Sequence, residues 1–246
     1  MRPLFAAAIL AAMSWLPASA QAEAVDVALV LAADVSRSVD DDEFKLQRQG
    51  YAAAVTNPRV LQSIAAGQHG AVAICFIEWS GPDEQQVVAE WTVVRDGETA
   101  AGFAATLMNA PRSFVGRTSV SAALDFSRAY FGKSRVVSDR RVIDVSGDGT
   151  NNSGRPVLDA RDETVAAGIT INGLAIINEH PNPGYFAHTQ PPEGLPEYYR
   201  QNVIGGPGAF LQVVQDFSSF GEAITNKLVN EIAAAPRPLH ASARPR

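Results

Sequence analysis

Continuous apolar runs alternate with amphipathic stretches along most of the chain. Runs rich in Val, Ile and Ala predict strands that are buried on both faces, because half-exposed strands alternate polar and apolar residues. Strands are predicted at residues 25–33, 71–79, 86–94, 141–145, 169–177 and 209–214. Helices are predicted at residues 40–55, which open with the acidic run 40–43, and at 98–109, 119–131, 156–167 and 216–234.

The order of these elements predicts an α/β fold. Alternating strands and helices indicate a three-layer α-β-α, doubly wound architecture with a mostly parallel six-stranded sheet. The turn at residues 80–83 is too short for a crossover helix, so strands 71–79 and 86–94 should pair antiparallel and supply one antiparallel edge strand. Residues 178–208, rich in Pro and Gly, predict a long irregular insertion after the carboxyl end of a parallel strand.

The two ends of the chain differ in composition from the rest. Arg2, the apolar run 4–16 and the small residues 18–20 are typical of a secretory signal, which we assign to residues 1–22. This run is shorter than the ~20 apolar residues that span a bilayer. We therefore expect an exported protein, periplasmic or secreted, with one domain at 25–235. We expect no membrane insertion after signal cleavage, and a disordered Pro/Arg-rich tail at 236–246.

Charge and cysteine content narrow the function classes. The formal net charge of −6 gives no basic surface for nucleic acid. Cys75 is the single cysteine and cannot form an internal disulfide; its place in an apolar run predicts a small buried side chain.

Polar side chains follow two of the predicted strands. Residues 34–38 (DVSRS) follow the first strand, residues 146–152 (SGDGTNN) follow the strand at 141–145, and residues 116–119 (GRTS) introduce the helix at 119–131. Ligands of open α/β sheets bind beyond the carboxyl ends of the parallel strands. We therefore expect convergence of Asp34, Ser36, Ser38, Thr118 and Asp148.

The chemistry of these five side chains indicates a hard divalent cation. Two carboxylates and three hydroxyls with no nearby His or Cys suit Mg²⁺, or alternatively Mn²⁺ or Ca²⁺. They are too few to complete the coordination shell of such an ion, which leaves a position for water or for an oxygen of a partner. An exposed cation with an open position would recognise a carboxylate.

The pattern Asp34-x-Ser36-x-Ser38, with Thr118 before a helix and Asp148-Gly149 after a later strand, resembles the metal-ion-dependent adhesion site of von Willebrand factor type A domains. The resemblance spans about residues 25–235 and is to a bacterial exported branch of that family. It implies direct coordination by the three hydroxyls, direct or water-mediated coordination by the two carboxylates, and a protein-binding module with no enzymatic activity. The family usually has Ser-Asp-Gly or Thr-Asp-Gly, whereas here Gly147 precedes Asp148.

Several alternatives remain open in the sequence. Thr118 could cap its helix, with or without a role in metal binding. Asp144 lies inside a strand and fits a member of a structural hydrogen bond or ion pair better than a metal ligand. The alternative function is a metal-assisted hydrolase of phosphates or esters, although no Gly-x-Ser-x-Gly motif occurs. The insertion contributes three candidate partner-binding residues, Tyr185, Tyr198 and Tyr199.

Overall fold

The computed structural model describes residues 22–177 and 191–233 of the 246-residue chain. Its main sheet has the strand order β4-β3-β2-β6-β7-β8, and neighbouring strands are parallel except for the antiparallel pair β3 and β4. The strands are β2 (Ala28–Asp34), β3 (Val72–Trp79), β4 (Gln85–Val94), β6 (Arg141–Gly147), β7 (Thr170–Ile176) and β8 (Leu211–Val214). The predicted sheet, including its antiparallel edge strand, is confirmed.

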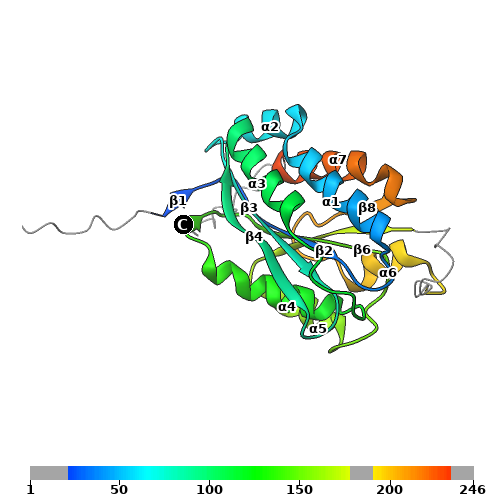
Figure 1. Cartoon of the computed structure of the whole chain (residues 1–246). Helices are drawn as coiled ribbons and strands as arrows, with labels where there is room; N and C mark the ends of the chain where they lie inside the picture. Colours follow the sequence, from blue (N-terminus) through cyan, green and yellow to red (C-terminus); the bar gives the residue numbers. More distant parts are fainter. Residues whose placement is uncertain (1–21, 178–190, 234–246) are drawn as a thin grey trace, which may run out of the picture.

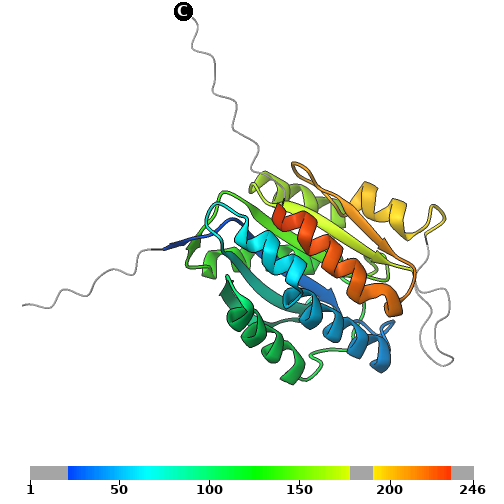
Figure 2. The same cartoon turned by 90° about the horizontal axis from the view of Figure 1, so that it is seen from above.

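Helices cover both faces of this sheet, as Figures 1 and 2 show. One layer consists of α1 (Asp41–Val55), α2 (Pro58–Ala65), α3 (Gly97–Asn109) and α7 (Phe220–Ala233). The other consists of α4 (Val120–Tyr130), α5 (Val157–Ala166) and α6 (Leu195–Asn202). The short elements are β1 (Glu23–Ala24), which pairs with β5 (Val136–Val137), and the 3-10 turns η1 (Phe131–Lys133) and η2 (Phe217–Ser219).

The central strand β2 divides the core into two halves. All seven of its residues are buried, and successive side chains point to opposite faces. Leu29 and Leu31 pack with the α1 and α7 layer, whereas Val30 and Ala32 pack with the α4 and α6 layer. Cys75 is a free, buried cysteine in the second half, as its sequence context predicts.

The start of α1 fixes the direction in which the chain leaves β2. Asp40 Oδ1 accepts hydrogen bonds from the backbone N–H groups of Asp42 and Glu43, both at 2.8 Å. Glu43 Oε2 in turn accepts from the Asp40 N–H at 2.8 Å, which completes a capping box. The acidic run therefore begins the helix, as predicted.

Two helices differ from the sequence-based expectation. Helix α2 was not predicted, although Asn57 caps it and Pro58 occupies its first turn. Helix α6 lies inside residues 178–208, so the prediction that this whole insertion is irregular was wrong. Three predicted segments lie wholly or partly outside the described residues: residues 1–21 of the signal, residues 178–190 of the insertion, and the tail at 236–246.

Candidate metal site

The loop after β2 carries the first three candidate ligands. Asp34 Oδ1 accepts a hydrogen bond from the Ser36 N–H at 2.7 Å, which turns the chain at the end of the strand. Gln47 of α1 donates from Nε2 to the Asp34 carbonyl oxygen at 3.1 Å. The carboxylate is thus held by its own loop, and the loop is held by the first helix.

Arg112 holds the same loop from the opposite side. Its Nη2 donates to three backbone carbonyl oxygens at 2.7–2.9 Å, those of Val35, Ser36 and Val39. Its guanidinium also lies 5.3 Å from the ring centroid of Phe44. Sequence reasoning missed this residue, because an arginine in a loop gives no signal of which distant carbonyls it reaches.

The hydroxyls and Asp148 form a continuous chain of polar contacts. Thr118 Oγ1 donates to Ser36 Oγ at 3.3 Å, and Ser36 Oγ lies 3.2 Å from Ser38 Oγ. Ser38 Oγ donates to Asp148 Oδ1 at 2.8 Å. Together with the Asp34 turn, these contacts bring all five predicted residues to one place at the carboxyl ends of β2 and β6.

Thr118 is oriented by the loop that follows β6. Its N–H donates to Asn152 Oδ1 at 3.1 Å, and its carbonyl oxygen accepts from the Asn152 N–H at 2.9 Å. The cap of α4 is supplied by Ser119, whose Oγ accepts from the Ala122 N–H at 3.3 Å. Thr118 is therefore not the cap residue, and its hydroxyl points to the serine cluster instead.

The space around Gly147 explains why a glycine precedes Asp148. A Cβ atom on Gly147 would lie 2.7 Å from the Tyr199 hydroxyl, closer than Cβ atoms approach other atoms in proteins, and 3.0 Å from Asp34 Oδ2, which is also a tight contact. The departure from the usual Ser-Asp-Gly or Thr-Asp-Gly run therefore makes room for Tyr199 of α6. Asp148 still reaches Ser38 across this glycine.

Two of the three candidate partner-binding tyrosines lie among the described residues, and they differ in burial. Tyr199 is completely buried, so its predicted role as a partner contact is wrong; burial raises the pKa of its hydroxyl well above the usual value and keeps it protonated. Tyr198 is partly buried, and its hydroxyl accepts a hydrogen bond from the Asn151 N–H at 3.1 Å. Tyr185 lies outside the described residues.

The donor set fits a hard cation that keeps water in part of its shell. Asp34, Ser36 and Asp148 are fully buried, Thr118 is almost so, and Ser38 is partly exposed. Within residues 22–177 and 191–233 no cluster of three or more His, Cys, Asp or Glu side chains forms a metal centre. These five residues contain only two carboxylates, and the three hydroxyls would complete the protein's share of the ligands.

A second group of charged side chains lies between β6 and α7, away from the strand ends, and has a structural role. Lys227 Nζ of α7 lies 2.8 Å from Asp144 Oδ1 and 2.6 Å from Glu231 Oε1, and all three side chains are buried. Asn172 Nδ2 donates to Glu231 Oε1 at 2.9 Å. The prediction that Asp144 belongs to an ion pair is confirmed.

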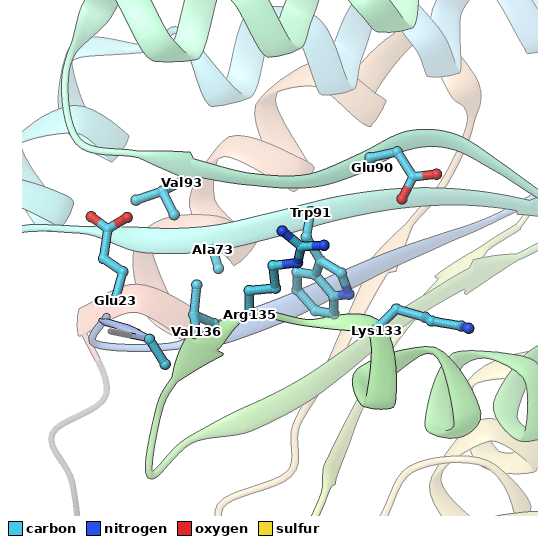
Figure 3. A pocket seen from close by; sticks show the side chains of 9 residues that line it. Glu23, Ala73, Glu90, Trp91, Val93, Lys133, Arg135 and Val136 are labelled. Atoms are coloured by element: carbon cyan, nitrogen blue, oxygen red, sulfur yellow. The ribbon is translucent and has the colours of Figure 1, made fainter. Parts of the chain in front are cut away.

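A cleft of about 860 Å³ lies away from these five residues, where β4 faces the β1–β5 pair. Figure 3 shows the labelled Trp91, Arg135 and Lys133 side chains along it, with Glu23 and Glu90 at its margins. The Trp91 ring stacks on Tyr130, with centroids 6.0 Å apart. None of the five candidate ligands lines this cleft.

Comparison with solved structures defines the class of fold. Proximal thread matrix protein 1 from the mussel byssus superposes with a TM-score of 0.63 at 12% identity over 86% of this chain, which spans 49% of the mussel chain. A further structure of that protein has a zinc-occupied MIDAS motif. The pilus adhesin SpaC from Lactobacillus rhamnosus GG gives 0.59 at 14% identity over 86% of this chain and 31% of the adhesin.

A von Willebrand factor type A protein from Catenulispora acidiphila gives a TM-score of 0.55 at 12% identity, covering 85% of this chain and 43% of that one. The fold is therefore that of a von Willebrand factor type A domain, as the resemblance in the sequence predicted. The family described as "Protein of unknown function (DUF1194)" matches residues 24–236, and the chain belongs to that family. No curated protein that was compared matches the chain significantly. Among the described residues, no helix has the length and apolarity to cross a bilayer.

Proposed function

We propose that this protein is an exported protein-binding module that holds one divalent cation, Mg²⁺ or alternatively Mn²⁺ or Ca²⁺, and uses it to bind a carboxylate of a protein partner. The observation that carries the proposal is the convergence of five oxygen-bearing side chains from three separate loops on one rim of the sheet. The ligands would be Asp34, Ser36, Ser38, Thr118 and Asp148.

The arrangement supports binding with no covalent chemistry. The five side chains offer oxygen ligands to a cation, and the hydrogen bonds that link them within the described residues involve no cysteine, histidine or lysine. The two carboxylates balance the formal charge of a divalent cation, but five protein ligands leave part of its coordination shell open, which allows a further oxygen ligand from outside. The similar structures include a matrix protein and a pilus adhesin, which agrees with a role in recognition.

Metal binding is tested by calorimetry with MgCl₂ and MnCl₂. Thr118→Val removes one candidate ligand while keeping the shape of the side chain, and should weaken binding roughly tenfold or more. Ser119→Ala is the matched control, because it removes the adjacent hydroxyl, which caps α4 and contacts the Ser121 hydroxyl but none of the five candidate ligands. Equal cation affinities in the wild type and the Thr118→Val variant would contradict the proposed ligand set.

Partner binding is tested by capture from an envelope extract with Mg²⁺ or with EDTA, using the wild type and Asp34→Ala. A specific partner should be retained only by the metal-loaded wild type, and replacing its contacting Asp or Glu by Asn or Gln should abolish retention. Retention that is unaffected by EDTA would contradict the carboxylate mechanism. Turnover of a phosphate or ester panel that is lost in Asp148→Ala would favour the hydrolase instead.

A further inference from the structure

Two glycines on neighbouring strands leave space for the side chain of Tyr199. Gly173 of β7 pairs with Val145 of β6, and Gly147 lies two residues further along β6 on the same face. A Cβ on Gly173 would lie 3.0 Å from Tyr199 Cδ1, and a Cβ on Gly147 would lie 2.7 Å from the Tyr199 hydroxyl. The ring of Tyr199 therefore passes over one glycine, and its hydroxyl ends at the other.

The Tyr199 hydroxyl has no hydrogen-bond partner among the described residues. The residue is also completely buried. Buried polar groups in native proteins nearly always have a partner, so an exception points to an unseen water, ion or functional role. The space that the missing Gly147 side chain leaves is shared by this hydroxyl and by Asp34 Oδ2.

We propose that Tyr199 is a positioning residue of the metal site, whose hydroxyl donates a hydrogen bond to Asp34 Oδ2, directly or through one water, when the cation is bound. This inference rests on the proposed function. It assigns to α6, an element that takes no part in the Asp-x-Ser-x-Ser motif, the role of setting cation affinity.

The chemistry of a coordinating carboxylate favours such a donor. Oδ1 of Asp34 is already oriented by the Ser36 N–H, and an outer hydrogen bond to the other oxygen would fix the plane of the carboxylate. A protonated phenol supplies one hydrogen and brings no competing charge. The donor would remain in place because the Tyr199 ring is packed in the core.

Helix α6 is also tied to the loop that follows Asp148. The neighbouring Tyr198 accepts a hydrogen bond from the Asn151 N–H at 3.1 Å, and Asn151 Oδ1 accepts from the Ser121 N–H of α4 at 3.0 Å. A displacement of α6 would therefore withdraw the Tyr199 hydroxyl and disturb the loop of Asp148 together. The affinity of the site for its cation would then follow the position of α6.

The test compares Tyr199→Phe with the wild type and with Tyr130→Phe as a matched control, because the Tyr130 hydroxyl contacts Glu90 away from the five ligands. Affinity for MnCl₂ is measured by calorimetry and by the electron paramagnetic resonance signal of free Mn²⁺. We expect Tyr199→Phe to bind roughly tenfold more weakly. We also expect a tyrosine difference spectrum on cation addition in the wild type and in Tyr130→Phe, but not in Tyr199→Phe.

Thermal unfolding separates this role from a structural one. Without metal, Tyr199→Phe should unfold at the same or a slightly higher temperature, because an unpartnered buried hydroxyl is removed. With metal, its gain in unfolding temperature should be smaller than that of the wild type. A wild type that binds no cation overturns both proposals. A wild type and a Tyr199→Phe variant with equal cation affinity overturn this inference alone.

Discussion

The substitution Asp144→Asn should change how the stability of the protein depends on pH. The Asp144 carboxyl is buried, and this burial, with the nearby Glu231 carboxylate, raises its pKa from 3.8 to about 7 in spite of the opposing effect of Lys227. Between these two values the folded protein keeps the Asp144 proton, whereas the unfolded chain has released it. Unfolding in this range therefore releases a proton.

The size of the effect follows from the difference between the two pKa values. Each unit corresponds to about 1.4 kcal/mol, so the stability that the retained proton provides amounts to about 4 kcal/mol. It is fully present below the unfolded pKa of 3.8, and it is lost progressively as the pH rises from there to the folded pKa of about 7. Asn cannot ionise, and in the variant Lys227 keeps its ion pair with Glu231 at 2.6 Å.

We expect the variant and the wild type to have similar stability below about pH 4, a difference that grows between about pH 4 and pH 7, and a variant more stable by up to about 4 kcal/mol at pH 8. The free energy of unfolding is measured by urea denaturation across this pH range. All other titrating groups are shared, so the difference between the two proteins isolates Asp144. Asp83→Asn, at an exposed position of the β3–β4 turn, is the control. Parallel pH profiles for wild type and Asp144→Asn would refute the reasoning.

Two further substitutions test contacts around the site. Gly147→Ala should destabilise the protein by about 1–3 kcal/mol, because the new methyl group meets the Tyr199 hydroxyl, and adding Tyr199→Phe should recover part of this loss in urea denaturation; an additive double mutant would contradict the contact. Arg48→Met should cost about 3–5 kcal/mol in the same assay, because it leaves the buried Glu78 carboxylate without its ion pair at 2.5 Å. A loss below 1 kcal/mol would show that the pair is dispensable.

The sheet could be predicted from the sequence because its signal is local. Runs such as residues 25–33 and 71–79 are apolar on both faces, which predicts buried strands, and the four-residue turn at 80–83 excludes a crossover helix, which predicts the hairpin. Helix α2 is only eight residues long, and α6 lies in a segment whose prolines and glycines favour irregular structure. Short helices that are stabilised mainly by tertiary packing leave a weak trace in the sequence.

The five candidate ligands could be predicted because each lies at the end of a strand or the start of a helix, where topology alone brings them together. The residues that hold these ligands in place could not be predicted. Arg112 contacts a carbonyl 77 positions away, and Tyr199 reaches the site only because two glycines on different strands leave space. Such contacts depend on side-chain packing between elements, which a single sequence does not encode in any short pattern.

The buried position of Cys75 has a practical consequence for spectroscopy. It is the single cysteine of the chain, and burial raises the pKa of its thiol well above the usual value, so it stays protonated and inaccessible to alkylating reagents. A cysteine introduced at the exposed Gln201 of α6 would then be the one reactive thiol of the folded protein. A spin label or fluorophore attached there would report the movement of this helix in the folded protein without replacement of Cys75.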